Sequence, residues 1–178
     1  LALTFVLAAC QTAHDSTAAH PLTFIVINDT YRLENLTYLR SLRAELEKAA
    51  GDVVVLHAGD FLFPSLLSQR FNGEQMVDGM NLLDGDAEAR DPHLLVTFGN
   101  HEFDRDKLKH APMLQSRINE SQFDWLGSNI VFKSDATGRK LIQGENRVAS
   151  RLLTGNGVKV GFGGGNTEVK GAEYIERF

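Results

Sequence analysis

The sequence predicts a layered α/β fold around a parallel β-sheet, and three observations support this prediction. Three apolar runs, which end at Asn28, Asp60 and Asn100, are hydrophobic almost throughout, as strands buried on both faces are. Segments with apolar residues at helical spacing separate these runs. Each run stops abruptly at polar or glycine residues. An alternation of buried strands and helical segments is typical of βαβ units, whose strands run parallel.

The first unit is predicted to be a strand followed by a long helix. Leu22–Asn28 is short and rich in β-branched residues, which favours a buried strand. In the next segment leucines recur at helical spacing between Leu36 and Leu46. Gly51 stands where a helix C-cap is expected, so we expect this helix to end just before it.

The second strand is predicted at Asp52–Asp60, written DVVVLHAGD. Pro64 suits the first turn of a helix, because its missing N–H has no partner there in any case. Apolar positions continue from Pro64 to Leu83. We expect breaks at Gly73 and Gly79, and therefore two short helices in this stretch.

The third strand is predicted at His93–Asn100, written HLLVTFGN, and a charged segment with helical spacing follows at 104–118. Pro112 is expected to bend or split that helix. A short fourth strand is predicted at Phe123–Asn129. Two later segments alternate in hydrophobicity and predict a hairpin or the edge of a sheet: 139–153 and 157–163.

Composition and charge restrict the class of protein. The chain has 178 residues, of which 43% are hydrophobic and 23% charged, as is usual for a soluble globular domain. Its net charge is −5 and no basic run is present. Because nucleic-acid binding depends on contacts between Lys or Arg and phosphates, we expect no nucleic-acid duplex as a partner.

The N-terminal segment predicts export. The apolar stretch Leu1–Ala9 is too short to span a bilayer, and it precedes Cys10, the only cysteine of the chain. The letters LAAC resemble a bacterial lipobox, whose cysteine becomes the lipidated N-terminus. We therefore interpret residues 1–20 as the remnant of a lipoprotein signal and a flexible tether. The protein would be lipid-anchored through Cys10, in the bacterial periplasm or at the cell surface. The alternative is a frayed apolar terminus with a chance cysteine.

Residues with chemical potential gather where the three strands stop. The first strand is followed by Asp29, the second ends at Asp60 and the third ends at Asn100 and His101. Ligands of open α/β sheets bind at the carboxyl ends of the strands, so these side chains are expected in one crevice. Carboxylate and amide oxygens with an imidazole nitrogen suit divalent cations such as Mn²⁺, Zn²⁺ or Fe²⁺. Glycine before Asp60 and before Asn100 lets the backbone turn tightly.

These blocks resemble, in order and spacing, those of the calcineurin-like metallophosphoesterase superfamily, and more narrowly its 5′-nucleotidase branch. The resemblance covers about Leu22–Ile130 and rests on five stretches: FIVINDTYRLENL, VVVLHAGDFLFPSLL, FNGEQMVDGMNLLD, FGNHEFD and WLGSNI. In the family the first block is Asp-x-His, the second Gly-Asp and the third Gly-Asn-His-Glu. The resemblance implies a four-layer α/β/β/α sandwich that hydrolyses phosphate monoesters, with nucleotides as the expected substrates.

The resemblance also implies a dinuclear centre of two divalent ions, Mn, Zn or Fe. Asp29 would bind the first ion, Asp60 would bridge both and Asn100 would bind the second. The ions would clamp the phosphate and supply a metal-bound hydroxide for in-line attack. His101 would stabilise charge in the transition state or protonate the leaving oxygen, and Asp104 would orient its imidazole.

The chain departs from the family pattern in two places. The expected Asp-x-His is Asp29-Thr30-Tyr31, and a phenol with a pKa near ~10 is a poorer ligand than histidine at neutral pH. Tyr31 would bind a ferric ion as phenolate, hydrogen-bond the substrate, or only fill the space. The family's later ligands, a single histidine and a Gly-His-x-His block, have no counterpart after His101. We therefore expect residues 21–178 to be a partial catalytic domain in a truncated chain.

A partial domain has physical consequences. One face of the sheet would lack its cover, so apolar surface would lie open on it. The carboxylates at the strand ends would lack counter-ligands, and we expect weak metal binding. Three functions stay open at this point: a 5′-nucleotidase-like phosphoesterase, a non-catalytic binding lipoprotein on the same fold, and a cyclic phosphodiesterase.

Four further features have simpler interpretations. Glu102 is expected to be structural, and His57 is expected to be a hydrogen-bonded core histidine. Asn129 is expected to hydrogen-bond a loop near the site. The glycine-rich stretch GFGGGNTE is a weak phosphate-loop signal, because no Lys-Ser/Thr follows the glycines.

Overall fold

The structure, a computed structural model, describes residues 22–155, 158–166 and 171–178. Within these residues the centre is a five-stranded sheet in the order β1-β2-β3-β4-β6, in which every neighbouring pair runs parallel. Its strands are β1 (Thr23–Ile27), β2 (Val53–His57), β3 (Leu94–Thr97), β4 (Asp124–Leu126) and β6 (Arg147–Val148). The predicted layered α/β fold with a parallel sheet is confirmed. The predicted signal remnant, tether and Cys10 lie outside the described residues.

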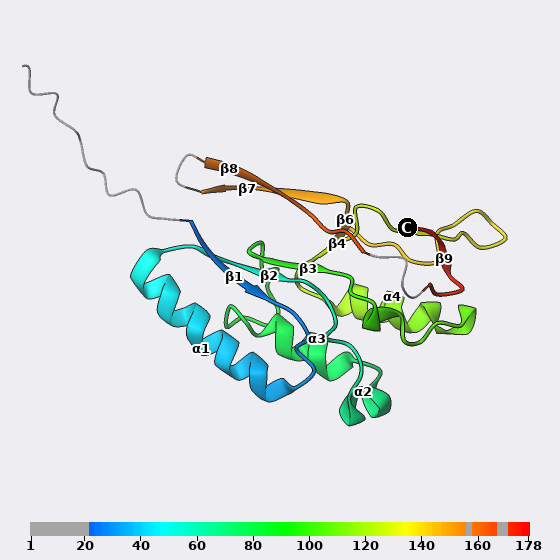
Figure 1. Cartoon of the computed structure of the whole chain (residues 1–178), viewed down its shortest axis with the longest axis horizontal. Coiled ribbons are helices and arrows are strands. Elements are labelled where there is room, and N and C mark those ends of the chain that lie inside the picture. The colour runs from blue at the N-terminus through cyan, green and yellow to red at the C-terminus, as the bar shows by residue number, and fades with distance from the viewer. Residues whose placement is uncertain (1–21, 156–157, 167–170) are drawn as a thin grey trace, which may run out of the picture.

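Helices cover one face of this sheet (Figure 1). They are α1 (Leu33–Ala50), α3 (Glu74–Asn81) and α4 (Ala111–Glu120), with the short α2 (Leu66–Phe71) beside α3. On this face Ile25, Val55, Val96 and Trp125 are buried in one large apolar core. The predicted end of the first helix is confirmed, because the N–H of Gly51 donates to the carbonyl of residue 47 at 3.0 Å.

A two-stranded antiparallel ribbon lies over the opposite face (Figure 1). It consists of β7 (Ser150–Gly155) and β8 (Val158–Gly163), so the predicted hairpin is confirmed. Beneath it lies a much smaller buried cluster formed by three side chains: Val54, Leu95 and Leu126. The strand β1 leaves Phe24 41% and Val26 69% exposed. The apolar surface predicted on one face of the sheet is therefore present.

Two predictions about the segment after β2 are wrong. Pro64 is not in a helical first turn, because Ser65 caps α2 by accepting the N–H of Ser68 at 3.0 Å. Gly79 does not end a helix but lies inside α3. A Cβ on it would come within 2.7 Å of the Leu36 side chain on α1, so glycine allows the two helices to pack closely. The predicted pair of short helices is confirmed.

The segment after β3 is more divided than predicted. Two short 3₁₀ helices, η1 (His101–Phe103) and η2 (Leu108–His110), precede α4. Pro112 lies in the first turn of α4, where proline is tolerated, and so it neither bends nor splits that helix. The antiparallel pair β5 (Val131–Phe132) and β9 (Ile175–Arg177) was not predicted. Among the described helices, none combines the length and apolar character needed to cross a membrane.

Candidate active site

The loops that follow β1, β2 and β3 meet at the carboxyl-terminal edge of the sheet. The N–H of Asp29 donates to the carbonyl of Gly59 at 3.2 Å. The N–H of His101 donates to Oδ1 of Asp60 at 2.6 Å, which places Asn100 next to the second loop. The three segments predicted to share a crevice are therefore in contact.

Both aspartates have an unusual backbone conformation. Asp29 has φ 56° and Asp60 has φ 62°, in the left-handed region that residues other than glycine seldom occupy. In the described part of the chain only one other non-glycine residue, Asn72, has positive φ. Residues held in such conformations gather at functional sites, because the surrounding structure must compensate for the strain. The geometry therefore makes the ends of β1 and β2 candidates for functional positions.

Two glycines allow the second and third loops to touch. A Cβ on Gly59 would lie 2.2 Å from the amide nitrogen of Gly99. A Cβ on Gly99 would lie 2.3 Å from Oδ1 of Asp60. Both distances are impossible for real atoms, so only glycine fits at these positions. The close approach sets the position of the Asp60 carboxylate.

The buried side chain of Glu102 forms hydrogen bonds with both of these loops. Its side chain is fully buried and accepts four backbone N–H groups: Asp60 at 2.7 Å, Phe61 at 2.9 Å, Leu62 at 3.1 Å and Gly99 at 2.6 Å. Burial raises the pKa of the Glu102 carboxyl, and the N–H donors of the second loop act in the opposite direction. The expected structural role is confirmed. Nothing in the local sequence pattern indicates that this residue would hold a loop about forty residues away.

His101 and Asp104 form a pair on η1. Nδ1 of His101 lies 3.1 Å from both carboxylate oxygens of Asp104. The two residues are three positions apart, so the 3₁₀ turn places their side chains on one face. Both side chains are partly exposed, at 31% and 21%. The arrangement leaves Nε2 of the imidazole free of that contact, and the catalytic role of the pair stays a prediction.

Tyr31 is a hydrogen-bond donor to Asp29. Its hydroxyl donates to one carboxylate oxygen of Asp29, and the amide of Asn28 donates to the other. Burial, the hydrogen bond to Asp29 and the neighbouring charges of Asp60 and Glu102 raise the pKa of the Tyr31 phenol. The phenol is therefore neutral in this arrangement. Its contact with Asp29 differs from the three roles considered for it above.

His57 connects the loop after β1 to the loop after β2. Its Nε2 lies 2.8 Å from Oγ1 of Thr30, and its Nδ1 accepts the N–H of Gly59 at 3.1 Å. Since Nδ1 accepts, the proton of the neutral ring is on Nε2 and is donated to Thr30. Burial lowers the pKa of His57 to about 4, although Asp29 acts in the opposite direction. The interpretation as a hydrogen-bonded core histidine is confirmed.

Asn129 holds the end of the glycine-rich stretch behind the third loop. Its amide donates to the carbonyl of Asn166 at 2.6 Å, and its oxygen accepts the N–H of Asn166 at 2.9 Å. The Asn166 amide in turn donates to the carbonyls of Phe98 at 2.9 Å and Gly99 at 3.2 Å. The predicted hydrogen bond from Asn129 to a nearby loop is confirmed, and residue 166 supports the backbone just before Asn100.

The donor atoms at this edge are suited to a hard divalent cation, but they are few. Asp29 and Asp60 supply carboxylate oxygens and Asn100 supplies an amide oxygen, all ligands that such cations accept. Within the described residues, no group of three or more His, Cys, Asp or Glu could hold a metal ion. The donors therefore fit a cation in kind, and the weak binding that we expect stays a prediction.

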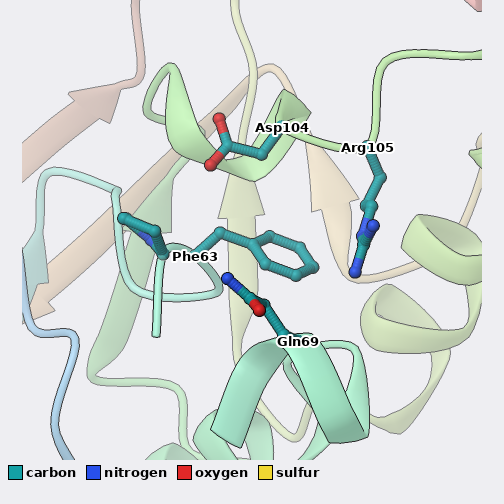
Figure 2. Close-up of a pocket in the computed structure, with 5 residues that line it drawn as sticks. Phe63, Gln69, Asp104 and Arg105 are labelled. Carbon is teal, nitrogen blue, oxygen red and sulfur yellow. The ribbon is translucent and has the colours of Figure 1, made fainter. Parts of the chain in front are cut away.

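A pocket of about 350 Å³ lies beside the His101–Asp104 pair. It is lined by Phe63 and Pro64 of the loop after β2, Gln69 of α2, and the consecutive residues Asp104 and Arg105. Figure 2 shows the Phe63 ring in the middle, with the polar ends of the other three labelled side chains around it. Sequence reasoning did not find this pocket, because its walls come from three separate segments.

Comparison with known proteins identifies one family and several solved structures with the same fold. Residues 22–166 match the family described as calcineurin-like phosphoesterase. A search of curated proteins gave no match.

Three solved structures share the fold. The NAD nucleotidase from Haemophilus influenzae has a TM-score of 0.67 and 18% identity over 88% of this chain. The 5′-nucleotidase precursor from Thermus thermophilus has the same TM-score, identity and coverage. The calcineurin-like phosphoesterase YfkN from Bacillus subtilis has a TM-score of 0.51 and 17% identity over 82% of this chain. The aligned part is 29%, 32% and 48% of those chains, so this chain spans about a third of the two nucleotidases.

Proposed function

Because the chain belongs to the calcineurin-like phosphoesterase family, we propose that it provides the site of a metal-dependent hydrolase of phosphate monoesters. The observation that carries the proposal is the contact between the three loops that bear Asp29, Asp60 and the Asn100-His101 pair. We further propose nucleotides as substrates, by analogy with the two nucleotidases whose fold it shares.

The proposed metal chemistry involves two divalent cations. When bound, such ions polarise the phosphoryl group and activate a water molecule for in-line attack. Asp29, Asp60 and Asn100 would hold them. The rigid backbone contacts around Asp60 fix its carboxylate before any ligand arrives, so little ordering is needed on binding.

His101 is the proposed proton donor. Its Nδ1 faces the Asp104 carboxylate, so the proton on Nδ1 would be held there and Nε2 would be the atom that contacts the substrate. A protonated imidazole placed in this way stabilises charge on the phosphoryl oxygens and gives its Nε2 proton to the leaving oxygen. Asp104 keeps the ring in the required orientation.

A second candidate function is a non-catalytic binding protein on the same fold. The specific observation in its favour is the hydrogen bond from Tyr31 to Asp29, which occupies a carboxylate oxygen that the first cation would use. A cyclic phosphodiesterase is a third possibility within the same chemistry, and no contact in the described residues favours it over a monoesterase.

The test is phosphate release from adenosine 5′-monophosphate in the presence and absence of Mn²⁺. We expect slow, Mn²⁺-dependent release that falls about a hundredfold or more in His101→Gln, because general acid catalysis contributes that much. His93→Gln is the matched control, since residue 93 precedes β3 at the opposite edge of the sheet. Release that is equal in His101→Gln would contradict the proposed role of His101. Binding of the nucleotide without any release would favour the binding protein.

We also propose that the protein is exported and anchored through a lipid on Cys10. The support is the LAAC sequence, which lies outside the described residues. Labelling of cells with a fatty acid analogue should mark the wild-type protein and leave Cys10→Ser unmarked. Equal labelling of both proteins would contradict the anchor.

A further inference from the structure

We propose that the pocket beside Asp104 binds a second phosphate carried by the leaving group of the substrate, and that Arg105 is its main contact. The inference rests on the proposed hydrolysis at His101, and it narrows the substrate class to phosphate esters that bear another phosphate. Hydrolysis would consume one water and break the bond between phosphorus and the ester oxygen. The proton from His101 goes to that oxygen, and the released alcohol keeps its second phosphate.

Contacts hold both the guanidinium and the backbone of Arg105. Its guanidinium lies over the Phe63 ring, with the central carbon 5.7 Å from the ring centroid. Its backbone carbonyl accepts the hydroxyl of Tyr174, a fully buried residue, at 3.0 Å. Stacking on an aromatic face leaves the N–H edge of a guanidinium available for hydrogen bonds. The side chain is therefore oriented before a ligand binds.

The positive charge of Arg105 has no carboxylate partner among the described residues. Three other buried or half-buried arginines contrast with it: Arg43 pairs with Asp91, Arg117 with Glu120 and Arg151 with Asp124. Arg147, over the Phe132 ring, resembles Arg105 in having no carboxylate partner among the described residues, but it does not line this pocket. A phosphate presents oxygens that match the N–H fork of a guanidinium, and such contacts are among the strongest hydrogen bonds in proteins. The guanidinium of Arg105 is therefore available to pair with an anion in the pocket.

The rest of the pocket fits a small polar anion. Gln69 extends from α2 toward the Phe63 ring on the side away from Asp104, and its amide can donate to phosphate oxygens (Figure 2). The negative charge of Asp104 is directed to the imidazole of His101, 3.1 Å away. The volume of about 350 Å³ exceeds that of one phosphate and leaves room for part of the alcohol that carries it.

The position of the pocket favours the leaving group over the reacting phosphate. Asp104 lines the pocket and also contacts His101, so the pocket and the proposed proton donor share a wall. A group that departs with the proton of His101 therefore lies at the mouth of this pocket. The reacting phosphate would lie on the other side, near Asp60, whose carboxylate accepts the N–H of His101.

The first test measures anion binding without metal, and so without catalysis. In excess chelator, inorganic phosphate is titrated into the ¹⁵N-labelled chain while the amide signals of Phe63 and Arg105 are followed. We expect saturable shifts at both, and a loss of affinity of about tenfold or more in Arg105→Gln, as charged hydrogen bonds are removed. Arg105→Lys should keep part of the affinity. Arg32→Gln, an exposed arginine paired with Glu34, is the control and should bind as the wild type does. Shifts that do not saturate, or that persist unchanged in Arg105→Gln, would overturn the proposal.

The second test measures selectivity. Adenosine 3′,5′-bisphosphate and adenosine 5′-monophosphate differ by one phosphate on the leaving group, and the ratio of their kcat/KM values reports its binding. We expect this ratio to fall about tenfold in Arg105→Gln. An unchanged ratio would contradict the inference. If neither compound is hydrolysed, the proposed function fails, while the phosphate titration still decides whether Arg105 binds an anion.

Discussion

The loop after β3 and the loop after β1 reach the same edge of the sheet but are held in different ways. The loop after β3 is held by one of its own residues, Glu102. The Glu102 side chain is fully buried and accepts backbone N–H groups from this loop and from the loop after β2. The loop after β1 is exposed at Asp29, whose carboxylate is held by the side chains of Asn28 and Tyr31. One buried contact, from Thr30 to His57, anchors it.

This difference indicates which part of the site exists before a cation binds. The position of Asp60 is set by backbone contacts with Gly99 and His101, so it costs little to order. In the proposed site, Asp29 would have to exchange its hydrogen bonds from Tyr31 and Asn28 for a cation. We infer that binding begins at the rigid half, around Asp60 and the third loop, and that the first loop adapts afterwards.

The largest expected effect comes from Glu102→Ala, which removes the support of the rigid half. Four backbone N–H groups would lose their acceptor, and we expect the free energy of unfolding to fall by about 3–5 kcal/mol. Urea unfolding followed by circular dichroism measures this change. Glu34→Ala removes an exposed carboxylate from α1 and should leave the unfolding midpoint unchanged. If Glu102→Ala and Glu34→Ala changed the free energy of unfolding equally, Glu102 would not be a special support of the loop after β3.

Gly99→Ala tests the close approach of the second and third loops. The new Cβ would meet Oδ1 of Asp60, so the loops must separate at a cost of about 2–3 kcal/mol in the free energy of unfolding. The affinity of Gly99→Ala for Mn²⁺ should fall as well. Gly161→Ala on β8 is the matched control, because no atom lies within 4 Å of a Cβ there. Calorimetric titration with Mn²⁺ and urea unfolding of both variants make the comparison.

The buried anchor of the first loop predicts a pH dependence. The pKa of His57 is about 4 in the folded chain, below its ordinary value of about 6.5 when unfolded, so the unfolded chain binds the proton first. Stability is therefore full above pH ~6.5 and falls by about 2 kcal/mol between pH 7 and pH 5. In His57→Gln this part of the pH dependence should disappear. If stability changed with pH equally in the wild type and in His57→Gln, residue 57 would not be buried in neutral form.

The smallest effect is expected from Tyr31→His in the adaptable half. Imidazole is a common ligand of divalent metals, and the substitution also removes the donor on Asp29, so we expect Mn²⁺ affinity to rise about tenfold. Tyr38→His, on the exposed face of α1, is the control. An unchanged or lower affinity in Tyr31→His would mean that Asp29 does not take part in binding the cation.

The sequence predicted the elements whose pattern is local. Apolar runs and helical spacing were enough for the parallel sheet, for α1 and for the presence of β1, β2 and β3. The second and third strands end earlier than predicted, at His57 and Thr97, because the residues that follow form the loops of the site. Because parallel strands place their carboxyl ends at one edge, those ends also predicted which loops meet. The pairing of His101 with Asp104 was implied by the resemblance to the family, and the structure brings the two side chains into contact.

Features that depend on distant contacts were missed. Gly79 is tolerated inside α3 because Leu36 of α1 packs against it, and no pattern near residue 79 carries that information. Glu102 binds N–H groups of Asp60, Phe61 and Leu62, about forty positions earlier. The short pair β5–β9 joins segments more than forty residues apart. The metal-binding role of Asp29, Asp60 and Asn100 stays a prediction.

The most direct test of the central claim is a titration of the ¹⁵N-labelled chain with Mn²⁺, a paramagnetic ion that broadens the signals of nearby amides. We expect weak binding that first broadens the amides of Asp60 and Asn100 and then that of Asp29. This broadening should be lost in Asp60→Asn. Broadening that instead begins at exposed acidic residues such as Asp84 and Asp86, and is unchanged in Asp60→Asn, would contradict a cation site at the end of the sheet.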